Sequence, residues 1–229
     1  MRRATLAHLL LAGGVLCALF SVLAVFDQAW EYAYGWLGLA LLLQAVDPAM
    51  VVRAEPGVAA FASIPATDSR AASAVAFLNT VFVPIIAMLH AGFLDGIGGI
   101  AVASVALLAA LYRLTFHAPA APSATEFLGL PAIWSVVGFY LHAFDATPLV
   151  AVAAIGLGIV LGLVPYRWPH PLWSGRWSLP TRFVTAVWVI TAAVTLWNGL
   201  PASATAKGVF LVTAFYGMAL AVLMARENG

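Results

Sequence analysis

Apolar runs of about 17 to 25 residues, the length that spans a bilayer as a helix, follow one another along almost the whole chain. Short polar segments containing proline or glycine separate them. Backbone polar groups in hydrocarbon must be satisfied within their own segment, so the runs are predicted to be helices rather than strands. The eight expected spans are 6–26, 33–52, 71–94, 97–116, 127–144, 148–165, 183–199 and 207–225. The pattern predicts an all-α integral membrane protein, a bundle of about eight transmembrane helices in one domain, 1–229.

The stretch from Trp36 to Thr80 is the part of this pattern that carries the functional question. It is predicted to form a helix running inward, a short polar loop, and a second helix running back out. Asp47, near the inner end of the first helix, is the one acidic residue that we expect inside the membrane. The other spans are expected to pack around this hairpin.

Composition excludes a soluble protein. Apolar residues make up 64% of the chain and charged residues 8%, whereas a soluble domain carries about 25% charged residues. A net charge of +1 gives no electrostatic footprint for nucleic acid. The single cysteine, Cys17, excludes a disulfide framework and a cysteine-based zinc pattern. The first run, Leu6 to Phe26, lacks a clear cleavage site and is expected to remain as a spanning helix rather than a signal peptide.

The basic residues give an independent test of the topology. An even number of spans places both termini on one side of the membrane, and with the N-terminus inside, nine of the ten basic residues fall on the inner side. The inner side then carries Arg2, Arg3, Arg53, Arg70, Arg113, Arg167, Arg176, Arg182 and Arg226, and the outer side carries Lys207. This strong positive-inside bias predicts cytoplasmic N- and C-termini.

Asp47 is the first candidate for a functional group, because a carboxylate at membrane depth is costly and is a functional hypothesis by default. Gln44 shares its helix face, and Arg53 follows six residues later, roughly 9 Å along a helix. Pro48 removes a backbone N–H and would kink the helix. The alternative is a structural role, in which Asp47 pairs with an inner arginine or caps the kinked turn. We weigh the two interpretations about evenly.

Other polar features have both a structural and a functional interpretation. A face of small residues on the third span favours close helix packing over a cavity lining. His8, His90 and His142 lie on different spans, so the sequence shows no metal-binding pair, and each is expected to be a hydrogen-bonded interior histidine. The basic inner loop, which contains Arg167, Arg176 and Arg182, could hold anionic lipid headgroups or simply set the topology.

Four patches give the chain a resemblance to bacterial phosphatidylcholine synthases, a branch of the CDP-alcohol phosphatidyltransferases. They are HLLLAGG at His8–Gly14, WLGLALL at Trp36–Leu42, FLGLPAIWS at Phe127–Ser135 and PYRWPHP at Pro165–Pro171. Their order and spacing resemble those of the family, which also has eight spans with the N-terminus inside. The resemblance implies a multi-pass protein of the bacterial inner membrane, with membrane lipids, including CDP-diacylglycerol, as partners and a homodimer as a possible assembly.

The resemblance also implies a reaction and a site. Family members make phosphatidylcholine and CMP from choline and CDP-diacylglycerol, using four aspartates in the pattern D-x-x-D-G-x-x-A-R followed by G-x-x-x-D-x-x-x-D. These carboxylates hold Mg²⁺ or Mn²⁺ against the CDP pyrophosphate, and one of them deprotonates the alcohol.

The first half of that pattern is mostly replaced in this chain. Gln44 stands at the first aspartate position, and Asp47 retains the second. Pro48 replaces the glycine, and Val52 replaces the arginine, although Arg53 follows one place later. By resemblance, Asp47 is the remnant catalytic and metal-binding residue, and Gln44, Arg53, Arg167 and Arg176 are the expected substrate-binding residues.

The second half of the pattern has lost its acids. Alignment on Pro84 places Asp68 at the glycine position and Ala72 and Ala76 at the two aspartate positions. One carboxylate and one amide are too few to hold two hard cations that each want several oxygen ligands. We therefore expect no retained metal cofactor and an absent or impaired reaction. The alternatives are an active phosphatidyltransferase with an altered site, which would need Mg²⁺ or Mn²⁺, and a small-solute carrier.

Overall fold

The computed structural model describes residues 2–45, 66–116, 126–128, 133–164, 167–169 and 175–227. Helices α1 (Arg2–Phe26) and α2 (Trp30–Ala45) form the first antiparallel pair. The next helix is continuous through α4 (Ala66–Phe77), the π-helical turn η2 (Leu78–Phe82) and α5 (Val83–His90), and is followed by α6 (Gly96–Phe116). The remaining elements are β1 (Glu126–Leu128), α7 (Trp134–Ala143), α8 (Pro148–Leu163), β2 (Arg167–Pro169), the 3₁₀ turn η3 (Gly175–Trp177), α9 (Ser178–Asn198) and α10 (Ala204–Glu227).

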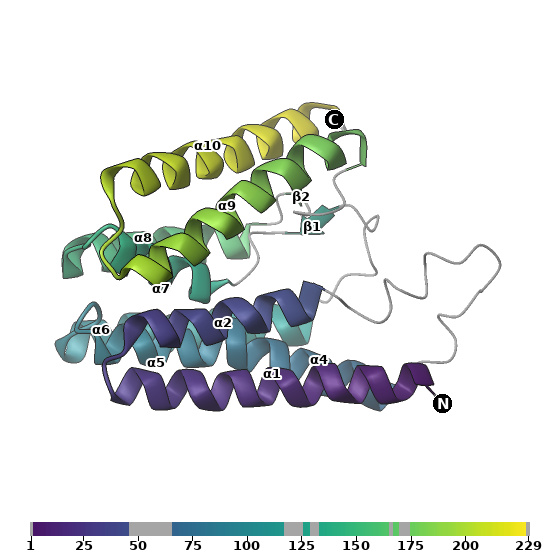
Figure 1. The fold of residues 1–229 in the computed structure, drawn as a ribbon, viewed down its shortest axis with the longest axis horizontal. Coiled ribbons are helices and arrows are strands. Elements are labelled where there is room, and N and C mark those ends of the chain that lie inside the picture. The colour runs from purple at the N-terminus through teal and green to yellow at the C-terminus, as the bar shows by residue number, and fades with distance from the viewer. Residues whose placement is uncertain are drawn as a thin grey trace.

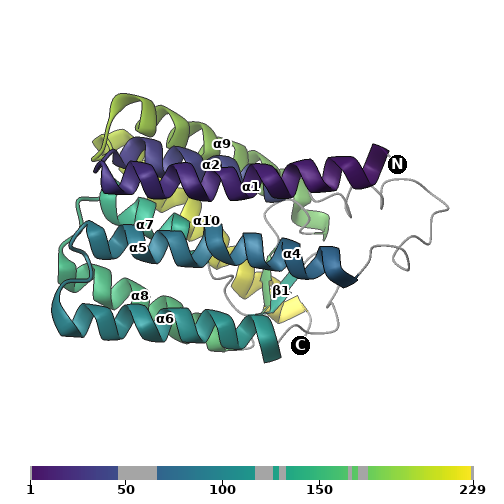
Figure 2. The same ribbon diagram turned by 90° about the horizontal axis from the view of Figure 1, so that it is seen from below.

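The long helices run side by side along one axis, and the chain ends marked N and C lie at the same end of the bundle (Figures 1 and 2). Each apolar run predicted from the sequence contains a helix of the described structure. Tight turns reverse the chain at the opposite end, and Gly92 and Gly199 adopt positive φ values of 78° and 95° there. Such values are accessible to glycine without steric cost, which explains its place in these turns.

The surface of the bundle is apolar, as lipid exposure requires. Leu149 is 79% exposed, Trp197 90% and Val212 70%. In the described residues, five helices are long and apolar enough to cross a membrane: Leu9–Phe26, Ser73–His90, Gly96–Arg113, Ser178–Asn198 and Ala204–Met224. The chain is therefore an all-α, multi-pass membrane protein. The count of eight crossings stays a prediction, because α7 has ten residues and would rise only about 15 Å.

The structure corrects the expected span 127–144 at its start. Residues Glu126–Leu128 form the strand β1, which pairs antiparallel with β2, and helix α7 begins only at Trp134. Gly129 and Pro131 lie between the strand and the helix in the sequence. Proline lacks the N–H that an α-helix interior needs and disfavours helical conformation at the residue before it, so the apolar run could not continue as one helix.

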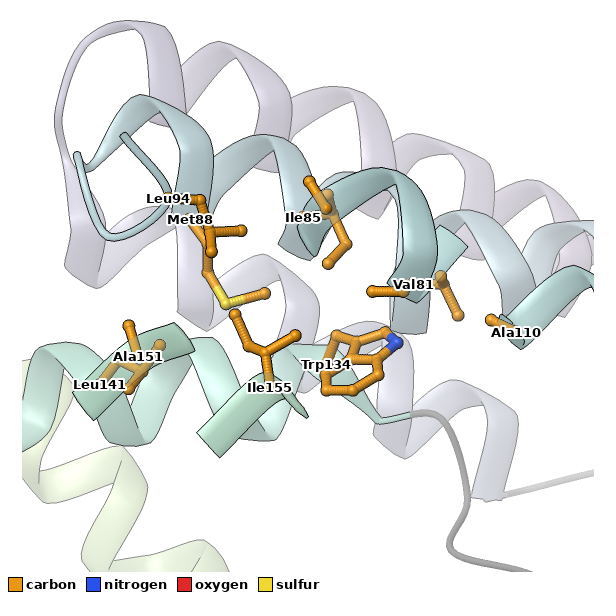
Figure 3. Close-up of a cluster of buried hydrophobic side chains, with 11 residues drawn as sticks. Val81, Ile85, Met88, Leu94, Ala110, Trp134, Leu141, Ala151 and Ile155 are labelled. Atoms are coloured by element: carbon orange, nitrogen blue, oxygen red, sulfur yellow. The ribbon is translucent and has the colours of Figure 1, made fainter. Parts of the chain in front are cut away.

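The core is divided among the helix interfaces. One buried cluster joins α5, α6, α7 and α8 and contains Ile85, Met88, Trp134 and Ile155 (Figure 3). A second cluster joins α1, α2, α7, α9 and α10 around Phe139 and fully buried Phe210. The aromatic rings of these two residues pack edge to face with centroids 5.4 Å apart. These contacts hold the later helices against the first pair.

The π-helical turn η2 has a local cause in the sequence. Pro84 sits in the first turn of α5, where an uninterrupted helix would need its N–H to bond to the carbonyl of Thr80. Instead the helix widens by one residue, and the backbone N–H of Val83 donates to the carbonyl of Leu78. The Thr80 hydroxyl donates to the carbonyl of Ala76 at 2.9 Å. A π-turn of this kind often marks a functional position within a helix.

Candidate functional site

The structure describes only part of the site predicted from the sequence. Gln44 lies one residue before the end of α2, while Asp47 and Arg53 fall outside the described residues. Arg167 belongs to β2, and Arg176 belongs to η3, where its guanidinium lies 5.3 Å from the ring centroid of Trp177. The roles assigned to these five residues therefore stay predictions.

Helix α1 meets the third span where the family pattern would place its last aspartate. Gly14 of α1 packs so closely that a Cβ built there would lie 2.6 Å from Cγ1 of Val75. Asn79 of η2 crosses the same interface, and its amide Nδ2 donates to the carbonyl of Gly14 at 2.9 Å and to that of Val75 at 3.0 Å. Val75 directly precedes Ala76 and Asn79 follows it by three residues; Ala76 is the position that the alignment on Pro84 assigns to the last aspartate of the family pattern. Close packing is thus what the structure shows beside this position.

Asn79 is a buried polar residue that the sequence analysis did not single out. It is fully buried, and its Oδ1 has no hydrogen-bond partner within the described structure. The orientation of the amide is fixed, because both of its partners are carbonyl oxygens and can only accept a hydrogen bond. A buried acceptor left unpaired is unusual and calls for an explanation. In the sequence Asn79 is recognisable only as one amide side chain within the apolar run after Ala71. The fold alone shows that this amide faces α1.

The four patches that carry the family resemblance come together in two pairs. The first two lie on the adjacent helices α1 and α2. A Cβ built at Gly13 of the first patch would lie 3.2 Å from Leu43, the residue after the second patch, and the ring of Phe20, six residues after the first patch, lies 4.9 Å from the ring of Trp36 in the second. The last two form the β1–β2 ladder, in which Phe127 pairs with Trp168. The patches are therefore structural contacts that connect distant parts of the chain.

His142 occupies a polar position near the opposite end of the bundle from the chain termini. The Tyr34 hydroxyl lies 2.8 Å from its Nδ1, and the carbonyl of Gly138 lies 3.1 Å from the same atom. The ring of Trp30 packs against it at a centroid distance of 4.6 Å. This confirms the expectation of a hydrogen-bonded interior histidine for His142. His90 differs: it is exposed and makes ring contacts to Trp30.

The metal-binding potential of the described helices is low. Within the described ranges, no three His, Cys, Asp or Glu side chains gather closely enough to hold an ion. In the alignment with the family pattern, Ala72 and Ala76 of the third span stand at aspartate positions, and alanine offers no oxygen ligand to Mg²⁺ or Mn²⁺. Asp47 lies outside the described residues, so the expected loss of the metal stays a prediction.

The fold thus defines an all-helical, multi-pass membrane protein, and comparison with known proteins gives its relatives. No protein-family model matches the chain. The phosphatidylcholine synthase of Bradyrhizobium diazoefficiens is 28% identical over 191 residues, which cover 82% of this chain and 69% of that protein. The phosphatidylcholine synthase of Pseudomonas aeruginosa is 27% identical over 188 residues, covering 82% of this chain and 77% of that protein.

The same relationship extends to Mesorhizobium japonicum, whose phosphatidylcholine synthase is 25% identical over 198 residues, 85% of this chain and 71% of that protein. Matches of this length cannot come from one apolar segment alone, since they include the loops and turns between the helices. The chain is thus similar to bacterial phosphatidylcholine synthases over about four fifths of its length, in agreement with the resemblance seen in its four patches.

Proposed function

We propose that this protein is a divergent homologue of phosphatidylcholine synthase that acts in phospholipid metabolism at the bacterial inner membrane and has lost most or all of the parent transferase activity. The parent reaction joins choline to the phosphatidyl group of CDP-diacylglycerol and releases CMP. In this proposal the chain keeps the membrane fold and a remnant of the lipid–nucleotide site, and it acts by binding rather than by turnover.

The similarity to phosphatidylcholine synthases over four fifths of the chain is the observation that carries the first half of the proposal. The matches run over 188 to 191 residues, far more than one motif. A role connected with phospholipid synthesis follows from that kinship. A place in the inner membrane agrees with the nine-to-one distribution of basic residues between the two sides of the predicted topology.

The missing carboxylates support the second half of the proposal, the loss of transferase activity. Gln44, Ala72 and Ala76 stand where the family pattern has three of its four aspartates, and no acidic residue occurs between Ala71 and Leu94. The close approach of α1 at Gly14 adds to this argument, because it leaves an apolar contact beside position 76. Asn79 offers one amide oxygen there, which carries no charge to balance a divalent cation.

The test is a transfer assay on purified protein in mild detergent. Labelled choline, CDP-diacylglycerol and Mn²⁺ are supplied, and both CMP release and labelled lipid are measured. The Pseudomonas aeruginosa relative, prepared in the same detergent, is the positive control. Loss of a direct metal ligand should exceed the 10- to 100-fold effect of losing a supporting contact, so we expect turnover more than about 100-fold below that control.

A binding measurement with the same samples tests the remnant site. CDP-diacylglycerol should raise the midpoint of thermal unfolding, Asp47→Ala and Arg53→Gln should reduce that gain, and Mn²⁺ should leave it unchanged. Turnover comparable with the relative's, abolished by Asp47→Ala, would instead establish an active transferase with an altered site. No effect of CDP-diacylglycerol on stability would contradict the proposed binding role.

A further inference from the structure

A small cavity of about 30 Å³ lies between α6, α7 and α8, and none of its lining residues belongs to α2 or the third span. Apolar and small residues form most of its wall, among them Ala109, Gly158 and Leu163. Two groups in the wall are polar: the guanidinium-bearing Arg113 near the end of α6, and the indole of Trp134 at the start of α7. The cavity therefore has an apolar body and two hydrogen-bond donors.

Trp134 is the more unusual of the two. Its side chain is 4% exposed, and its Nε1 has no hydrogen-bond partner among the described residues. In Figure 3 the blue indole nitrogen faces Ala110, which also lines the cavity. A tryptophan N–H usually finds a partner when it is buried, because an unpaired donor loses its hydration without compensation. An acceptor oxygen entering the cavity would satisfy it.

The position of the indole is fixed by packing. A Cβ built at Gly158 of α8 would lie 2.9 Å from ring atoms of Trp134, so the ring rests directly on the glycine backbone. The ring also belongs to the buried cluster that joins α5, α6, α7 and α8. The donor is thus held in place without a ligand, which lowers the entropic penalty of binding one.

Depth in the membrane determines which ligand can reach this cavity. Arg113 closes the apolar window Gly96–Arg113 of α6, at the end of the bundle where both chain termini lie (Figure 2). In the topology predicted from the basic residues this end is cytoplasmic. Leu163 at the cavity is 48% exposed and joins it to the apolar outer surface of α8. A ligand that combines an anionic group with hydrocarbon would meet both surfaces at once.

We propose that this cavity is a phospholipid-binding site, in which a lipid of the inner leaflet places its phosphate at Arg113, gives an ester or phosphate oxygen to the Trp134 N–H, and lays an acyl chain over Leu163. A space of about 30 Å³ is too small to enclose a headgroup, so only oxygen-bearing groups enter and the rest of the lipid lies along the surface. The site is independent of any transferase activity and of Asp47.

The test measures binding of phosphatidylglycerol to the delipidated protein, by native mass spectrometry and by the lipid-dependent rise in thermal unfolding midpoint. Arg113→Gln should weaken binding about tenfold or more, as expected for a charge-assisted contact of about 1.5–3 kcal/mol. Trp134→Phe keeps an aromatic ring, although a smaller one, and removes the indole N–H, and it should weaken binding several-fold. Arg3→Gln, which removes an arginine of α1 from the same side of the membrane, is the matched control and should leave binding unchanged.

Two further arms keep the proposal falsifiable if Trp134→Phe fails to fold. Ala109→Leu fills the cavity and leaves Arg113 in place, and it should lower lipid binding while the lipid-free unfolding midpoint stays the same or rises. Diacylglycerol, which lacks the phosphate, and inorganic phosphate, which lacks the chains, should each stabilise the protein less than phosphatidylglycerol. Equal weakening by Arg3→Gln, equal binding of diacylglycerol or equal stabilisation by inorganic phosphate would overturn the proposal.

Discussion

The contact between Gly14 and Val75 gives the sharpest quantitative prediction about this fold. In Gly14→Ala the new Cβ would start 2.6 Å from Cγ1 of Val75, whereas carbon atoms in contact normally lie about 3.5–4.0 Å apart. Helix α1 must move away by about 1 Å, and Asn79 then loses part of its 2.9 Å hydrogen bond to the Gly14 carbonyl. Overpacking of this kind costs about 1–3 kcal/mol.

The matched control is Gly38→Ala, because a Cβ there meets nothing within 4 Å. Both changes replace a helical glycine by alanine, so the helix-propensity gain of roughly 0.5–1 kcal/mol cancels in the comparison. Adding Val75→Ala to Gly14→Ala removes the clashing methyl group and should recover part of the loss, which would appear as a coupling energy between the two sites.

The single cysteine provides a local assay for this movement. Cys17 lies on α1 near Gly14 and is 3% exposed, so its thiol should react slowly with a maleimide in the native protein. Gly14→Ala should lower the thermal unfolding midpoint in detergent and raise the labelling rate of Cys17, and Gly38→Ala should do neither. Equal midpoints and equal labelling rates for the two variants would refute the close α1 contact.

Two further predictions concern the end of the bundle opposite the chain termini, and both are measured as thermal unfolding midpoints in detergent. Glu31 Oε1 accepts a hydrogen bond from the backbone N–H of Leu200 at 3.0 Å, so Glu31→Ala, which leaves that donor unpaired, should destabilise by about 1–3 kcal/mol. Glu31→Gln keeps an acceptor oxygen and should lose clearly less stability than Glu31→Ala. An equal loss of stability in the two variants would show that the hydrogen bond to Leu200 is not the cause. Tyr34→Phe removes the hydroxyl 2.8 Å from His142 and should cost about 1 kcal/mol, whereas Tyr32→Phe at a 71% exposed position should cost nothing measurable.

Part of the candidate site followed from residue identities alone. From the sequence, alignment on the family pattern predicts that Gln44, Ala72 and Ala76 stand at three of the four aspartate positions, and this stays a prediction. The sequence could not indicate that Asn79 bonds to Gly14, which is 65 residues away, or that Val75 closes on the same glycine. Such contacts depend on which faces of two helices meet, and an apolar helix in lipid has no hydrophilic face to reveal its orientation.

The sequence by itself determined the solvent and the helices of this protein, and it predicts the sidedness. Lipid is the only solvent compatible with 8% charged residues, backbone groups in lipid must form helices, and the basic residues sort to one side. Only the tertiary structure decided where α7 begins, that Phe127 pairs with Trp168, and that Trp134 presents to a cavity beside Arg113 an N–H with no partner among the described residues. The physical reason is that composition acts on each segment independently, whereas these features arise from packing between segments far apart in the chain.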